Sequence, residues 1–156
     1  MGPGKGDKMM NWKTIAAAAA FAGVALCSAF AAEGTHDARI AIMKKVGGAA
    51  GALAGIAKGE KPYDADAVKA ALTTIAEMAK AFPEQFGPDS DKTDAEVNPK
   101  VWDNMDDFKA KAAKLSGNAE TALAGLPADP AAVGALLKTL GADCGACHQD
   151  YRIKKN

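Results

Sequence analysis

Apolar residues recur at helical spacing in four separate stretches of the chain. In residues 36–58 they stand alternately three and four positions apart, which is typical of a helix that packs one face against neighbouring helices. The apolar positions of this stretch are Met43, Val46, Ala50, Leu53 and Ala57. Residues 65–81, 98–126 and 130–155 repeat the pattern, and no stretch alternates as a half-buried strand would. The pattern therefore predicts four amphipathic helices and no sheet.

Residues that favour helix ends stand at the borders of these stretches. The expected N-terminal caps are side chains that accept a hydrogen bond from the first turn, and two of them precede a proline at the first helical position. They are Thr35, Asp64, Asn98 before Pro99, and Asp129 before Pro130. Gly59 is expected just after the first helix, and Pro83 ends the second. Gly117 and Asn118 mark an expected weak point in the third helix.

The links between these helices are short, except for the polar segment 83–98. We expect this segment to cross the molecule, with Phe86 holding part of it to the core. A chain of 156 residues is long enough for one domain. Four amphipathic helices with mainly short links predict an all-α fold, an antiparallel four-helix bundle.

The first 31 residues have the features of a secretory signal peptide. Lys8 and Lys13 supply a positive start, and an apolar run from Ile15 to Phe30 follows. Small residues at 29 and 31 fit the cleavage rule and make Ala32 the expected first mature residue. The sequence thus divides into a leader, 1–31, and one bundle domain, 32–156.

Two other interpretations of the leader are weaker. A transmembrane anchor needs about 20 apolar residues, and this run is shorter, so no stable membrane span is expected after cleavage. A lipoprotein signal at Cys27 would need a small residue before the cysteine, where Leu26 stands. Met9 or Met10 is a second candidate for the true start of the chain.

The balance of charged residues argues against nucleic acid as a partner. The chain has 19 basic and 19 acidic residues, and the leader contains three of the former and one of the latter, which leaves 16 and 18 in the mature part. A net charge of −2 provides no basic field for nucleic acid. Alanine is abundant and aromatic residues are few, a composition that favours helices.

The candidate chemistry lies near the C-terminus, in Cys144-Gly145-Ala146-Cys147-His148. Cys-x-x-Cys-His is the attachment motif of a c-type haem. Two thiols add across the two vinyl groups of the porphyrin, and the histidine offers an imidazole nitrogen to the iron. On a helix all three side chains face one side, where a flat macrocycle must lie.

Other uses of the two cysteines fit the sequence less well. A thioredoxin-type dithiol expects a βαβ context, and no strand pattern is present. A structural zinc site needs four ligands, for which only His36 and Cys27 remain as additions. A structural disulfide suits an exported protein but does not account for His148.

With this motif at the end of a four-helix chain, the sequence resembles the cytochrome c-prime family, the class II c-type cytochromes. The resemblance covers nearly the whole mature chain and rests on three stretches: 144–152, the pair 82–87 and 99–108, and 39–44. It implies a left-handed bundle with one covalent haem c per chain. Cys144 and Cys147 would anchor the haem, His148 would be the proximal iron ligand, and Arg39 would lie near a haem propionate. Family members often dimerise through their first two helices.

Met43 separates two branches of this family. In the low-spin cytochrome c-556 branch, which the chain resembles most, a first-helix methionine four residues after the arginine is the sixth iron ligand. In the high-spin branch an apolar side chain stands there and the iron binds nitric oxide or carbon monoxide. The spacing of Arg39 and Met43 fits the first branch. Met43 also lies on the apolar stripe, so a plain core methionine is the competing interpretation.

The expected function is that of a bacterial periplasmic electron carrier that exchanges single electrons with redox partner proteins. No acid–base or nucleophile constellation suggests an enzyme. The alternative is a five-coordinate haem protein for diatomic gases, with Gly47, Ala50 and Gly51 leaving room for the ligand. A third possibility is a small helical binding protein that uses the dithiol without haem.

Overall fold

A computed structural model describes Met1 and residues 33–153, so the rest of the predicted leader and its cleavage site lie outside the described residues. The described part forms α1 (His36–Ala57), α2 (Ala65–Ala81), the 3₁₀ helix η1 (Phe82–Phe86), α3 (Lys100–Asp103), α4 (Met105–Ala124) and α5 (Pro130–Tyr151). Residues 33–153 contain no strand, only an isolated β-bridge between Val97 and Arg152. The predicted all-α four-helix bundle is confirmed.

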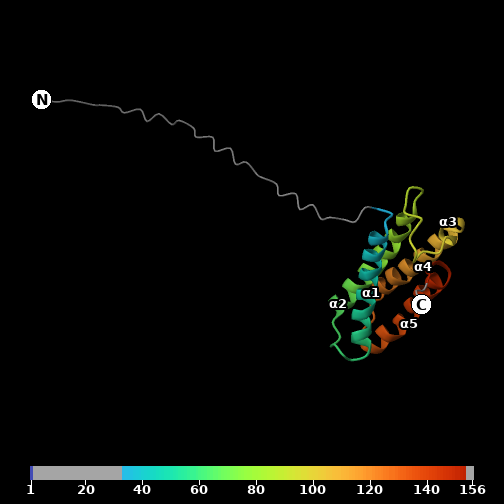
Figure 1. Cartoon of the computed structure of the whole chain (residues 1–156). Coiled ribbons are helices and arrows are strands. Elements are labelled where there is room, and N and C mark those ends of the chain that lie inside the picture. The colour runs from blue at the N-terminus through green and yellow to red at the C-terminus, as the bar shows by residue number, and fades with distance from the viewer. Residues whose placement is uncertain (2–32, 154–156) are drawn as a thin grey trace.

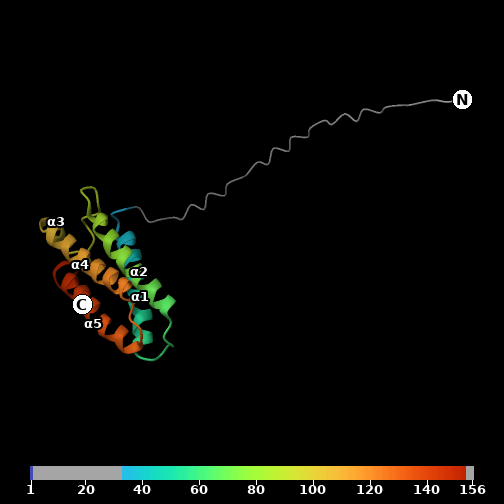
Figure 2. The ribbon, with the colours of Figure 1, turned by 180° about the vertical axis from the view of Figure 1, so that it is seen from behind.

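The four long helices form a closed ring around the core. α1 packs against α2 and α5, and α4 packs against the same two helices from the other side. Figure 1 shows α1 and α5 on the near side, and the reverse view of Figure 2 brings α2 and α4 forward. The first and last helices are therefore neighbours, although they are far apart in the sequence.

Side chains cap three helix starts at the predicted positions Thr35, Asp64 and Asp129. Each accepts a hydrogen bond from a first-turn amide, at 3.3 Å from Ala38, 2.9 Å from Asp66 and 2.8 Å from Ala132, respectively. Gly59 follows α1 with a φ of 75°, which an L side chain adopts only with strain. Local chemistry thus determines these boundaries.

The third predicted helix is divided, contrary to the prediction of one helix from 98 to 126. Asn104, with φ −127° and ψ 46°, ends α3 and precedes α4. Its carbonyl oxygen accepts hydrogen bonds from the amide of Phe108 and, at 3.4 Å, from the hydroxyl of Tyr151. The predicted start is one residue early, because α3 begins at Lys100 with Pro99 at the cap position. The side chain of Asn98 still accepts a hydrogen bond from the amide of Lys100, at 3.1 Å.

The predicted weak point at Gly117 and Asn118 is also wrong, because α4 is continuous there. Asn118 Nδ2 donates to Asp143 Oδ2 of α5 at 2.6 Å, and the neighbouring Ala119 is fully buried. Packing against two other helices outweighs the low helix propensity of these residues.

Two apolar clusters fill the bundle. The larger one joins α1, α2, α4 and α5 around Leu53, Leu72, Ile75 and Val133, each at most 2% exposed. The second is aromatic and lies where η1 and α3 meet the ends of α4 and α5. Its buried members are Phe86, Val101, Phe108 and Tyr151, and Cys147 packs against it. Phe86 is 3% exposed, so the prediction that it anchors the 83–98 segment is confirmed.

Candidate haem-binding site

Helix α5 presents the cysteine motif to the interior of the bundle. Cys144, Cys147 and His148 are all part-buried and line one pocket, as the one-sided spacing predicts. Both cysteines are free thiols in this structure. The three side chains of the motif therefore face one cavity and not the outer surface of the bundle.

The other walls of this pocket come from the remaining helices and are largely apolar. Met43 and Val46 come from α1, Ala79 from α2, Phe82 from η1, and Lys111, Ala112 and Leu115 from α4. Asp143 of α5 completes the lining. Met43 and His148 thus border the same cavity from the first and the last helix. An apolar cavity with a few polar groups is the usual form of a cofactor site.

Burial controls the protonation of the motif. It raises the pKa of Cys147 to about 11. It also raises the pKa of Cys144, and the negative charge of Asp143 raises that pKa further. Burial also lowers the pKa of His148, and the positive Arg152 acts in the same direction. Near neutral pH the imidazole is therefore uncharged, with a nitrogen lone pair available to a metal, and the thiols are not thiolates.

The competing uses of the cysteines find little support in this geometry. Among residues 33–153, no group of three or more His, Cys, Asp or Glu side chains is arranged to hold a metal ion by itself. High thiol pKa values are the opposite of those in reactive dithiols. The small residues expected to leave room for a gas do not line the pocket, since Gly47 and Gly51 lie on the exposed face of α1.

An ionic network that the sequence analysis missed borders the pocket. Lys111 Nζ lies 3.0 Å from Asp107 Oδ2 on α4 and 3.3 Å from Asp150 Oδ2 on α5. The hydroxyl of Tyr151 donates to Asp107 Oδ2 at 2.5 Å. These bonds connect α4 to the last turn of α5, next to His148. The Asp107 and Lys111 spacing of four residues was the one signal in the sequence.

Arg39 lies one helical turn before Met43 but does not line the pocket. It is 3% exposed, and its Nη1 lies 3.2 Å from Asp94 Oδ2. Its Nε and Nη2 donate to the carbonyl of Gln85 at 3.3 and 3.0 Å. The guanidinium carbon also stands 4.4 Å from the ring centre of Phe86.

Beside this arginine is a buried donor that lacks an acceptor. The Nε1 atom of Trp102 is buried and has no hydrogen-bond partner among the described residues. The Arg39 guanidinium carbon lies 5.9 Å from the Trp102 ring centre. Buried N–H groups are rarely left unpaired, so an acceptor from a bound group fits here. An apolar cavity lined by two thiols, an imidazole and a thioether, with an unpaired donor nearby, suits a haem with its propionates.

A four-helix bundle with this motif and cavity defines a haem protein of the c type. Residues 35–152 match the family model described as Cytochrome C′, and the chain belongs to this family. Its cofactor is therefore haem c, which carries electrons on its iron.

Known cytochromes of the c-556 and c′ types are similar to this chain in sequence and in structure. The chain is 78% identical over 123 residues to a cytochrome c-556 of Agrobacterium tumefaciens (strain apple 185), which covers 79% of this chain and 98% of the relative. It resembles the structure of cytochrome c′ from Rhodopseudomonas palustris, with a TM-score of 0.69 and 34% identity over 76% of this chain and 94% of that one. An NMR-validated model of oxidised cytochrome c556 from the same species gives a TM-score of 0.67 and 33% identity, over 77% and 96%.

Proposed function

We propose that the protein is a periplasmic single-electron carrier in which His148 and Met43 are the two axial ligands of the haem iron. The observation that carries this proposal is the shared cavity, which Met43 borders from α1 and His148 from α5. Cys144 and Cys147, on the same wall as His148, are the covalent anchors.

Each of these residues has a distinct part. Burial keeps His148 neutral, so its nitrogen is free for the iron. Met43 supplies a thioether, a soft ligand that raises the potential of a haem. Val46, Phe82 and Leu115 exclude water from the cavity, which favours the less charged ferrous form. If both His148 and Met43 stay bound to the iron, the surroundings of the iron change little when it gains or loses one electron.

Arg39 and Trp102 lie outside the cavity lining, beside the aromatic cluster against which Cys147 packs, and they complete the proposal. We assign Trp102 Nε1 as a donor to a haem propionate, because the atom is buried without a partner. Arg39 would add its positive charge to the same carboxylate. Its present bonds to Asp94 and Gln85 hold the guanidinium beside Trp102.

We attribute export of the protein to the proposed signal peptide, residues 1–31. Cleavage before Ala32 would leave 125 residues, close to the 123 that span 98% of the Agrobacterium tumefaciens relative. Within the described residues α1 alone is long and apolar enough to cross a bilayer, but it forms one side of the bundle and contains Arg39, Lys44 and Lys45. We assign α1 to the folded domain and export to the preceding leader.

The ligand assignment can be tested by the visible spectrum of the ferrous holoprotein before and after carbon monoxide is added. We expect a sharp α-band that carbon monoxide barely changes, because Met43 occupies the sixth position. Met43→Ala should open that position, so carbon monoxide should shift the spectrum. Met78→Ala is the matched control, since Met78 packs in the core outside the cavity.

A wild-type spectrum that shifts readily with carbon monoxide would contradict the assignment. Met43 would then be a core residue, and gas binding would become the better description of the function. A holoprotein that cannot be cycled between ferric and ferrous forms would reject the carrier function itself.

A further inference from the structure

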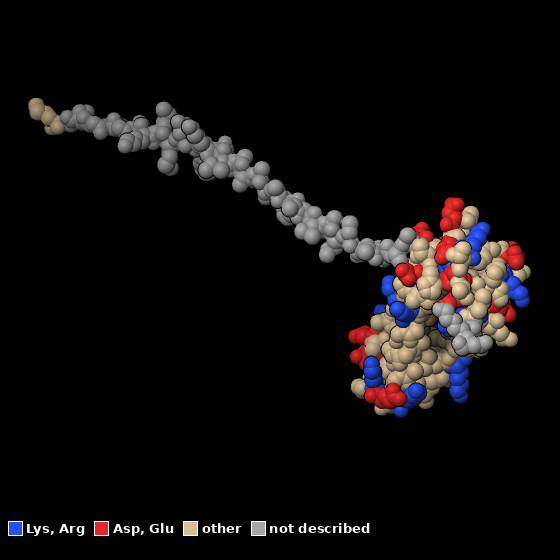
Figure 3. Space-filling model, in the orientation of Figure 1, with Lys and Arg blue, Asp and Glu red and all other residues tan. Residues whose placement is uncertain are grey.

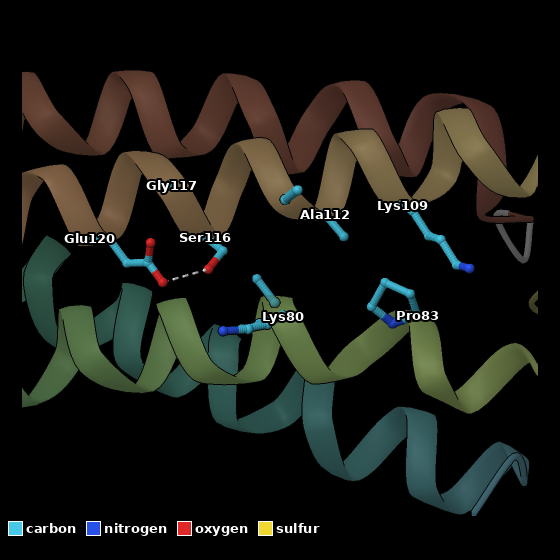
Figure 4. A pocket seen from close by; sticks show the side chains of 9 residues that line it. Lys80, Pro83, Lys109, Ala112, Ser116, Gly117 and Glu120 are labelled. Carbon is cyan, nitrogen blue, oxygen red and sulfur yellow. Dashed lines mark hydrogen bonds between the residues drawn. The ribbon is translucent and has the colours of Figure 1, made fainter.

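A second concave surface lies on the opposite side of the bundle from the α1–α5 face. It is a groove of about 390 Å³ between α2 and α4, shown in Figure 4. The hydroxyl of Ser116 donates to the carbonyl of Ala76 at 3.0 Å and joins the two helices beneath it. The groove is thus a fixed feature of the packing between α2 and α4.

The groove and the haem cavity share a wall. Ala79 of α2 and Ala112 of α4 line both spaces and are 2% and 7% exposed. An alanine contributes a single methyl group, so one thin layer of side chains separates the two. Electron tunnelling weakens steeply with distance, and a redox centre held in this groove would therefore be near the haem.

Two lysines and one glutamate, Glu120, are the charged residues that line the groove, so its charged side chains sum to one positive charge. Lys80 and Lys109 line it, and both are exposed. Figure 4 shows Lys109 beside Pro83, and Lys80 nearer the end where Ser116 and Glu120 lie. Neither lysine forms an ion pair or a side-chain hydrogen bond with another residue of 33–153. By contrast, Lys111 is held by two aspartates.

We propose that this α2–α4 groove is the docking site for an acidic redox partner protein, with Lys80 and Lys109 facing its carboxylates. The proposal rests on the carrier function proposed above. Opposite charges across such a surface steer encounter and raise the association rate, an effect that salt removes. The haem that Cys144 and Cys147 would anchor would receive the partner's electron across the alanine wall.

Reduction by flavodoxin, an acidic protein, tests this site by stopped-flow absorption. Its anionic flavin hydroquinone gives one electron and becomes the neutral semiquinone, while the ferric holoprotein becomes ferrous. We expect Lys80→Glu/Lys109→Glu to slow the second-order rate by about tenfold at low ionic strength and to abolish most of its salt dependence. Ala113→Trp should slow the rate without a change of charge, because Ala113 is an exposed residue of the groove.

Lys44→Glu/Lys45→Glu is the matched control, with the same charge change at two exposed residues of α1, outside the groove. We expect it to change the rate by less than about twofold. Equal slowing in the two double variants, or none in the groove variants, would overturn the proposal. The spectrum and reduction potential of every variant should match the wild type, and a wild type that no donor reduces would instead reject the carrier function.

Discussion

At the residue scale, Asp94 balances the buried positive charge beside the proposed propionate site. It accepts bonds from the Arg39 guanidinium, the His36 ring and the Glu96 amide. Burial by itself would raise the pKa of Asp94, but the hydrogen bonds of Glu96, His36 and Arg39 lower it below its usual value. The haem-attachment motif and the helix caps could be recognised in the sequence, because each depends on residues that are neighbours along the chain. The bond between Arg39 and Asp94 could not be predicted, because 55 positions separate the two residues in the sequence.

A depressed carboxyl pKa makes part of the stability depend on pH. The contribution of Asp94 is fully present above the unfolded pKa near 4 and is lost as the pH falls through the lower folded value. Asp94→Asn should reduce the free energy of unfolding by about 3 kcal/mol at pH 7, because Arg39 is left buried without its partner. Urea titrations of the holoprotein at pH 7 and pH 3 measure both effects. A variant as stable as the wild type at pH 7 would show that Arg39 does not need Asp94.

At the element scale, α1 combines a buried stripe with an unusually bare outer face. Gly47, Gly48 and Gly51 are exposed, and a Cβ atom at any of them would meet nothing within 4 Å. Periodicity predicted this helix well because its apolar stripe is regular. The break at Asn104 could not be predicted in this way, since the hydroxyl of Tyr151 from another helix contributes to it. Sequence patterns describe a helix face, whereas tertiary bonds decide where a helix is interrupted.

A pair of glycine substitutions separates propensity from strain. Gly48→Ala should stabilise the protein by about 1 kcal/mol, because alanine is the better helix former and the site is open. Gly34→Ala should destabilise it, because Gly34 has a φ of 76° and the new Cβ would lie 2.8 Å from that of Ser90. Urea denaturation of both holoproteins measures the two signs. A loss of stability in Gly48→Ala would mean that a contact outside this chain, such as a dimer interface, covers that face.

At the scale of the whole molecule, charged side chains leave part of one face of the bundle uncovered. Figure 3 shows a mainly uncharged area over the lower part of the face that α1 and α5 turn to the viewer, with charged side chains around it. The four-helix bundle was predictable from periodicity, and the class of the cofactor was predictable from one five-residue motif. The ring order of the helices and the shared alanine wall were not, because both depend on how helix faces meet in space.

The proposed leader and the covalent haem predict a definite product. In a bacterium with haem-attachment machinery, the full chain should yield a periplasmic protein that begins at Ala32 and carries one haem. The haem should remain on the chain after denaturation, since two thioethers hold it. Intact-mass measurement of the periplasmic fraction tests both points, and Cys144→Ser/Cys147→Ser should lose the added mass. Cytoplasmic retention of an uncleaved chain would contradict the leader assignment.

The contact between α1 and α5 has a consequence for the order in which the protein is made. Translation and export deliver α1 early and α5 last, so the cavity lacks one wall until almost the whole chain has been synthesised. The two cysteines proposed as anchors and the histidine proposed as the proximal ligand arrive with that final helix. A chain that ends before α5 cannot close the ring, and a chain that ends before residue 144 lacks the proposed haem anchors, so the position of the motif would restrict haem attachment to chains that are nearly complete.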